Sequence, residues 1–311
     1  MRSVQQCLVL LGREDEAMGI INEYVDNNAN SPFTRSFRSD GARILFDGRK
    51  YDKAIDEYEK IIQNDPGNED NAEILYWIGK SYISLDKPEE AEKAFLKVQS
   101  KYPESDYASL SLMENALLQK KSARAKKADS LFASLIEIYP NKNEAPRAVF
   151  ERALINFTLR DTTFGLSMYD YAFKTYPGDE YADESGYRLA NYYKRLDSNE
   201  LSRDYFLRLA MNTNSNDIAA ESYYRLGELF KKEKKLDSAE AAYLQVKNNY
   251  SGYEDWFSLS LVNLGEIYEQ TDQYAKAEEI YSALLELRPD DEYGNTAKAR
   301  LKRVRKAMGE Q

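Results

Sequence analysis

The sequence predicts an all-α solenoid, a right-handed superhelix of helix–turn–helix repeats with a 37-residue period. Three columns of residues predict it. Small residues recur at steps of 37 residues, six times, and then 38: Ala17, Ala54, Ala91, Ala128, Gly165, Ser202, Ala239 and Ala277. Four residues after each stands a large apolar residue: Ile21, Tyr58, Phe95, Phe132, Tyr169, Phe206, Tyr243 and Tyr281. Twelve residues after the small residue, five repeats have a proline: Pro66, Pro103, Pro140, Pro177 and Pro289. One long period shared by independent columns is typical of stacked helical repeats.

Residues 74–103 show what one repeat contains. Apolar residues three and four apart predict two amphipathic helices, separated by a turn at residues 86–88. Gly79 on the first helix and Ala91 on the second are small, so the two backbones can approach closely. We expect Phe95 to fill the space beside them. Neither helix can bury its apolar face alone, which is why the repeats have to stack.

The unbroken period predicts a single solenoid over residues 1–311. Residues 1–32 form a truncated first repeat, and residues 33–289 form seven further repeats. Residues 290–311 form a C-terminal capping helix, because a solenoid needs a polar cover on its last open face. The apolar stripe of this helix is Ala297, Leu301 and Val304, and six bases cover its other sides. The alternative is a basic helix that binds anionic lipid or nucleic acid.

The N-terminus begins inside a helix. Counting back from Ala17 places Met1 within the first helix of a repeat, and MRSVQQC lacks the apolar core of a signal peptide. Cys7 is interpreted as a small helix residue. We therefore expect this chain to be part of a longer protein, in which any export signal lies upstream.

The columns resemble the tetratricopeptide repeat (TPR) family. This family places small residues on both helices, an aromatic residue before the turn and a proline at the end. Here the aromatic residues before the turn include Tyr82, Tyr193, Phe230 and Tyr268. The family's unit is about 34 residues long, and the extra residues here follow the proline, as in YPESDYA. This longer unit resembles TPR proteins of the bacterial envelope, such as the Tol-Pal accessory protein and the lipoprotein of the outer-membrane barrel-assembly machine.

Composition disfavours several classes of function. The chain has no histidine, one cysteine and a net charge of -10, which argue against a metal site and against broad binding of nucleic acid. No glycine-rich phosphate loop is present, and acid pairs such as Glu89 and Glu90 lie on exposed helix starts. No stretch of about 18 apolar residues predicts a transmembrane helix. We therefore expect no catalytic residues, no metal and no cofactor.

The resemblance implies a concave groove lined by the first helices. One position of this lining holds Tyr76, Met113, Phe150, Tyr187 and Tyr224, and a second holds Lys80, Leu117, Leu154, Asn191 and Glu228. A third holds Ile83, Lys120, Phe157, Lys194 and Lys231. Aromatic residues beside cations are typical of binding hot spots. The predicted partner-binding residues are Tyr76, Lys80, Phe150, Phe157, Tyr187, Asn191, Lys194 and Tyr224. The alternative is that several of these aromatic rings pack between repeats.

Two functions remain open at this point. The first is a non-catalytic scaffold that binds a peptide or partner domain in its groove, as a bacterial cell-envelope assembly or maintenance factor in the periplasm or at the outer membrane. It would act as a monomer or as part of a larger complex. The second is a cytoplasmic regulatory TPR module of a larger multidomain protein. The turn at residues 120–127, with five bases, is either solvated or a docking site for an acidic partner.

Overall fold

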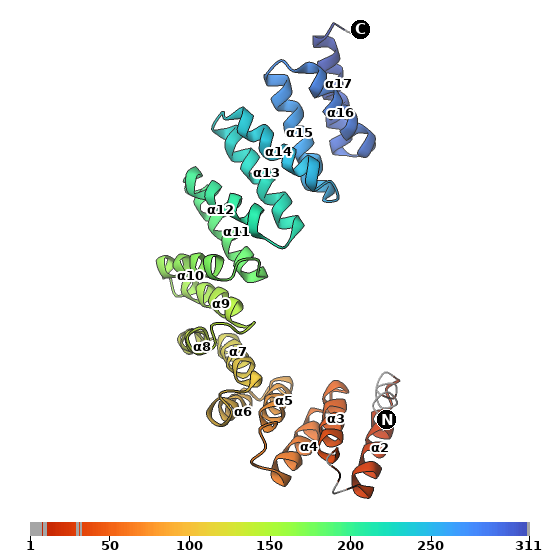
Figure 1. Ribbon diagram of the computed structural model, residues 1–311, viewed down its shortest axis with the longest axis vertical. Coiled ribbons are helices and arrows are strands. Elements are labelled where there is room, and N and C mark those ends of the chain that lie inside the picture. Colours follow the sequence, from red (N-terminus) through yellow and green to blue (C-terminus); the bar gives the residue numbers. More distant parts are fainter. Residues whose placement is uncertain (1–7, 9–10, 29–30, 32, 310–311) are drawn as a thin grey trace. The chain divides into compact units, whose positions relative to one another are not determined.

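The computed structural model describes residues 8, 11–28, 31 and 33–309. These residues form sixteen α-helices, α2 to α17, and contain no strand, so the all-α prediction is confirmed. The chain divides into two compact units, residues 1–162 and 163–311, and each is described by itself (Figure 1). The single solenoid predicted over residues 1–311 stays a prediction. Most of the first helix expected in the truncated repeat, with Cys7, lies outside the described residues.

Unit 1 consists of eight helices, beginning with the second helix of the truncated repeat and ending with the first helix of another repeat. They are α2 (Glu14–Asn27), α3 (Thr34–Asp47), α4 (Tyr51–Asn64), α5 (Asn71–Ser84), α6 (Pro88–Lys101), α7 (Asp106–Lys121), α8 (Ala125–Ile138) and α9 (Ala145–Thr158). Pro146 lies in the first turn of α9, where its missing N–H costs no helical hydrogen bond.

Unit 2 repeats the same pattern and ends with an unpaired helix. Its helices are α10 (Thr162–Thr175), α11 (Glu180–Arg195), α12 (Asn199–Asn212), α13 (Asn216–Lys232), α14 (Leu236–Asn249), α15 (Glu254–Gln270), α16 (Tyr274–Leu287) and α17 (Glu292–Ala307). Asn214 stands where other repeats have the boundary proline, and its side-chain amide donates to the Gly178 carbonyl at 3.0 Å.

The turn between the two helices of a repeat has the same backbone conformation seven times. One residue in each turn is left-handed, with φ between 55° and 65°: Arg49, Asp86, Ala123, Arg160, Asp197, Lys234 and Asp272. The next amide donates five residues back, as from Lys87 to the Tyr82 carbonyl at 2.9 Å. This is a Schellman C-cap, which satisfies carbonyls that the helix end leaves without a partner. None of these seven left-handed residues is glycine, the residue that usually marks such a cap, so the sequence did not predict the caps.

The small and large columns meet in the core of each repeat. Phe95, Phe132, Phe206 and Tyr243 are all fully buried. A Cβ added to Gly79 would lie 2.4 Å from the Phe95 ring, so glycine is what allows this approach. The predicted close packing of the two helices, with Phe95 filling the space beside Gly79, is therefore what the structure shows.

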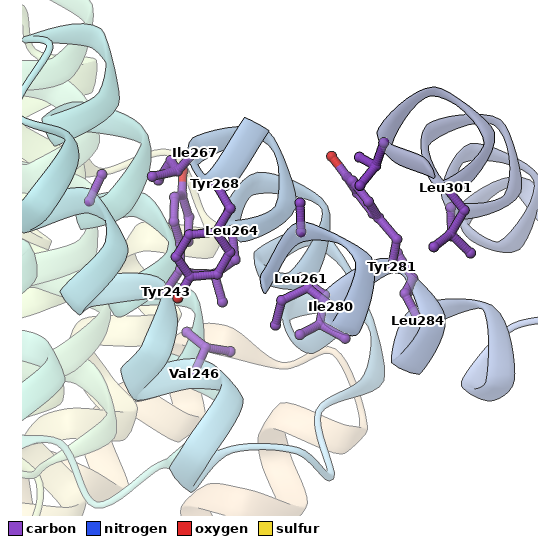
Figure 2. Packing of buried hydrophobic residues seen from close by; sticks show 14 of the residues in the cluster. Tyr243, Val246, Leu261, Leu264, Ile267, Tyr268, Ile280, Tyr281, Leu284 and Leu301 are labelled. Atoms are coloured by element: carbon purple, nitrogen blue, oxygen red, sulfur yellow. The ribbon is translucent and has the colours of Figure 1, made fainter. Parts of the chain in front are cut away.

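In unit 2 one apolar cluster runs from α13 to the C-terminal helix. Figure 2 shows its side chains continuing from Tyr243 through Leu264 to Tyr281 and Leu301. The stripe predicted for α17 belongs to this cluster, since Ala297 and Val304 are fully buried. Three of the bases of α17 form ion pairs with acids of α15 and α16: Arg300, Arg303 and Arg305. The apolar stripe of α17 is thus occupied by the fold and does not face a lipid surface.

Candidate partner-binding face

The first-helix face is defined here as the side chains at the three lining positions of α5, α7 and α9 in unit 1, and of α11 and α13 in unit 2. Three of the predicted binding residues on it are buried. Tyr76 and Phe150 are 8% exposed, and Tyr224 is 6% exposed. The Tyr76 ring lies 5.4 Å from Tyr107, and the Tyr224 ring lies 5.8 Å from Tyr243. Burial raises the pKa of the Tyr224 hydroxyl to about 12. Tyr76 packs against the next repeat and Tyr224 packs within its own, so these buried rings do not present a surface to a partner.

The cations predicted on this face are already paired. Lys80 Nζ lies 2.6 Å from Glu114, and Lys194 Nζ lies 3.1 Å from Glu228. The equivalent Lys120 and Lys231 pair with Glu151 and Glu266, each at 2.5 Å. Every one of these pairs joins a first helix to the first helix of the following repeat. Lys194, one of the predicted partner-binding residues, is therefore already engaged by Glu228 within the protein.

In unit 2 these pairs extend into a network between α11 and α13. The Tyr187 hydroxyl donates to Glu221 at 2.7 Å, and Arg225 donates to Glu221 at 3.0 Å and to Glu228 at 3.0 Å. Burial alone would raise the pKa of Glu228, but hydrogen bonds from Arg225 and Lys194 outweigh it and hold the pKa below its ordinary value. The network is internally neutralised.

Tyr187 and Asn191 have internal roles in the same network. Asn191 Nδ2 donates to the Tyr187 carbonyl at 3.0 Å, within α11. The Asn191 amide therefore already has an acceptor for one of its two N–H donors. Tyr187 itself is half-buried, and its hydroxyl is held by Glu221.

In unit 1 the same face keeps apolar side chains partly exposed. We call Ile83, Leu117, Leu154 and Phe157 the apolar row, since each is half-buried and they follow one another along α5, α7 and α9. Leu117 lies three residues after Glu114 and three before Lys120, so it shares a helix face with both ion pairs. Leu154 stands in the same relation to Glu151. Pairs of opposite charge thus frame an apolar surface across three repeats.

The basic turn at residues 120–127 is largely neutralised by neighbouring repeats. Lys120 pairs with Glu151 and Lys127 with Glu92, while Arg124 donates to the Gln119 side chain at 3.3 Å. Three of its five bases therefore have partners within unit 1. This arrangement weakens the interpretation of the turn as a docking site for an acidic partner.

The glutamates that pair with the lysines of the first-helix face are not among the residues predicted from the sequence. Their signal was present as a glutamate 31 to 35 residues after each lysine, for example 34 residues from Lys80 to Glu114. A column search at a fixed 37-residue step misses it. Relative to the 37-residue step, the glutamate lies two to six residues earlier in the next repeat, on the turns of that helix that face the lysine.

Among the residues that the structure describes, no three His, Cys, Asp or Glu side chains are grouped so that they could hold a metal ion. No helix described by the structure is both long enough and apolar enough to cross a membrane.

Comparison with known families agrees with the geometry of the repeats. Residues 45–113 match one family model of the tetratricopeptide repeat, and residues 220–248 and 259–291 match another. The chain is a tetratricopeptide repeat protein. TPR arrays are protein–protein interaction scaffolds, and the TPR fold is typically non-catalytic. No curated protein matches the chain in sequence.

A solved structure of a TPR repeat-containing protein has the same fold, and two others are less similar. The C-terminal part of a TPR repeat-containing protein from Cytophaga hutchinsonii is 13% identical, with a TM-score of 0.53 over 82% of this chain and 97% of that one. A tetratricopeptide repeat protein from Parabacteroides merdae is 14% identical, with a TM-score of 0.45 over 83% and 96%. The pilF structure from Pseudomonas aeruginosa is 15% identical, with a TM-score of 0.44 over 72% and 96%.

Proposed function

We propose that this TPR protein is a non-catalytic scaffold that binds a protein partner on the first-helix face of unit 1. One observation carries the proposal. The apolar row stays half-exposed across α5, α7 and α9, whereas the charges beside it are paired with each other. Apolar side chains framed by satisfied polar groups are the usual anatomy of a protein interface, with an apolar centre and a polar rim.

The same geometry defines the partner's chemistry. Lys80 and Lys120 are engaged by Glu114 and Glu151, so an acidic partner would have to break these pairs first. A segment with apolar side chains spaced to meet Leu117, Leu154 and Phe157 needs no such exchange. The partner is thus an apolar segment or domain surface.

For its cellular role, we propose that the protein assembles or maintains the bacterial cell envelope, in the periplasm or at the outer membrane. The support is the long TPR unit with its residues inserted after the Tyr-Pro step, such as YPESDYA and YPGDEYA. Fractionation of cells that express the full gene tests this location. Recovery of the protein with the cytoplasm would contradict it.

Site-specific photocrosslinking tests the binding face. A photoreactive amino acid placed at Leu117 or at Leu154 should give an adduct of the same mass in both cases, since one partner spans both helices. The control position is Leu207 on α12, a second-helix leucine that is 46% exposed and lies outside the apolar row. Crosslinking at Leu207 alone, or adducts of unrelated mass at each position, would contradict the proposal.

Binding of the captured partner is then measured with matched variants. Leu117→Asp and Leu154→Asp place a charge in the apolar row, and each should weaken binding at least tenfold, or about 1.4 kcal/mol. Leu207→Asp makes the same change on an exposed leucine elsewhere and should bind as the wild type does. All three positions retain solvent exposure, so the melting temperatures should stay close to that of the wild type.

A further inference from the structure

A second surface of unit 1 is hollowed between two second helices. A cavity of about 420 Å³ lies between α4 and α6, with the back of α5 as its floor. The floor is apolar and includes Leu75, Ile78 and Tyr82. Tyr102 and Ile62 are half-buried and extend this apolar lining to the walls. On α5 these are not the positions used by the first-helix face, so this groove is a separate surface.

Three lysines line one wall of this groove. Lys93, Lys97 and Lys101 follow one another at intervals of four residues along α6, so they form one row on the helix. The row is about 12 Å long, from a rise of about 1.5 Å per residue. All three side chains are exposed. Among the residues that the structure describes, none of these ammonium groups has a carboxylate within 4.0 Å.

This lack of pairing sets the row apart from the lysines of the first-helix face. Lys80, Lys120, Lys194 and Lys231 each have a glutamate within hydrogen-bond distance. The chain carries a net charge of -10, so acids are abundant. Three bases in a row beside an apolar cavity are left available for an external anion.

The row belongs to this repeat alone. The equivalent residues in the preceding repeat are Asp56, Lys60 and Asn64, and in the following repeat they are Ser130, Ser134 and Ile138. In unit 2 the four second helices carry no lysine at these positions: Ser167, Tyr171, Thr175, Asp204, Arg208, Asn212, Ala241, Gln245, Asn249, Glu279, Ala283 and Leu287. The repeat architecture therefore does not require the lysines, since six other second helices pack without them.

We infer that the groove between α4 and α6 is a second docking site, which accepts an amphipathic helix with an acidic side from a partner protein. Its apolar face would lie on the half-buried Ile62, Tyr82 and Tyr102, above the buried floor, and its carboxylates would face the lysine row. A helix laid in an apolar groove with charges along one wall is an established mode of peptide recognition.

The two acids of the groove give the bound helix a direction. Glu59 and Glu90 also line the cavity, and both lie near the Tyr82 hydroxyl. Burial and the charges of these two carboxylates raise the pKa of that hydroxyl. Lys97 and Lys101 lie toward the other end of α6, beside Tyr102. The acidic residues of the partner helix should therefore concentrate at the Tyr102 end, away from Glu59 and Glu90.

Binding of two labelled peptides to the full chain tests the inference. The first is an amphipathic helix with leucine on one face and glutamate on the other, and the second replaces each glutamate with lysine. Fluorescence anisotropy should show saturable binding of the glutamate peptide and at least tenfold weaker binding of the lysine peptide. Substituting Lys93→Glu, Lys97→Glu and Lys101→Glu together should weaken the glutamate peptide at least tenfold.

A charge-matched control separates the groove from the net charge. Substituting Lys121→Glu, Lys126→Glu and Lys298→Glu changes the net charge by the same amount at three exposed positions outside the groove. This variant should bind the glutamate peptide within about twofold of the wild type. Equal loss in both triple variants would overturn the inference, because it would show non-specific attraction.

Two other results would also overturn it. One is absence of saturable binding by the glutamate peptide in the wild type. The other is sedimentation with vesicles of anionic phosphatidylglycerol that depends on Lys93, Lys97 and Lys101 while the peptide does not bind, since the site would then serve a membrane. Neither result bears on the apolar row, because crosslinking at Leu117 and Leu154 does not involve this groove.

Discussion

Gly227→Ala tests the close packing on which each repeat depends. Gly227 lies within α13, and a Cβ at this position would be 2.4 Å from Cε1 and 2.5 Å from Cζ of Tyr243. Carbon atoms in favourable contact are about 3.5 to 4.0 Å apart, so the methyl group is too close by about 1 Å or more. Tyr243 is fully buried, so its ring has no open space to move into.

Two opposing terms set the size of the effect. Overpacking of a buried core costs about 1 to 3 kcal/mol, whereas alanine gains about 1 kcal/mol over glycine in helix propensity. We expect the upper part of the first range, and therefore a net loss of about 1 to 2 kcal/mol. For a unit of this size each kcal/mol lowers the melting temperature by about 2 to 4 °C.

Thermal unfolding followed by circular dichroism measures the loss, and Gly19→Ala is the control. Gly19 lies in the interior of α2, and nothing lies within 4 Å of a Cβ built there. That substitution should stabilise by up to about 1 kcal/mol. A Gly227→Ala protein as stable as the wild type, or more stable, would refute the packing argument.

Three further predictions concern stability. Ala123→Gly should raise the free energy of unfolding by about 1 kcal/mol in a denaturant titration, because Ala123 is left-handed at φ 58° and glycine adopts that conformation without strain. Asp183→Asn should stabilise the protein at pH 7. Burial raises the pKa of Asp183 in the folded protein above its ordinary 3.8, so the free energy of unfolding of the wild type falls as the pH rises from 3.8 through that folded pKa. Asparagine carries no charge and does not lose this stability. The gain should vanish below pH 3.8 when melting is repeated there, and a gain independent of pH would contradict this origin. Deletion of Glu292 to Gln311 should uncover the apolar cluster at α16 and give aggregation in light scattering, whereas an unchanged monomer would show that α17 is not a cap.

The sequence was sufficient for the repeat architecture because the period acts on residues that pack within one repeat. Ala91, Phe95 and Gly79 recur together, since each copy must solve the same packing problem. The conformation of the turns could not be predicted from the sequence. Their left-handed residues, such as Asp86 and Ala123, have no shared residue type, so only the backbone reveals the common cap.

The binding face was predicted less well, for two physical reasons. Helical periodicity cannot tell a ring that covers the neighbouring helix from one that faces solvent, so it predicts Tyr76, Phe150 and Tyr224 as partner-binding residues although they are buried. Helical periodicity also does not reveal that Lys194 is engaged, because its partner Glu228 lies on another helix. Pairing between repeats does not follow from a column of identical positions.

The most direct test of the account compares partner binding and melting for Leu154→Asp and Tyr224→Ala. The account predicts that Leu154→Asp loses at least tenfold in binding at an unchanged melting temperature, because Leu154 is half-exposed on the apolar row. Tyr224→Ala should lower the melting temperature, because its ring is 6% exposed and packs on Tyr243. Full binding by Leu154→Asp would contradict the proposed scaffold surface.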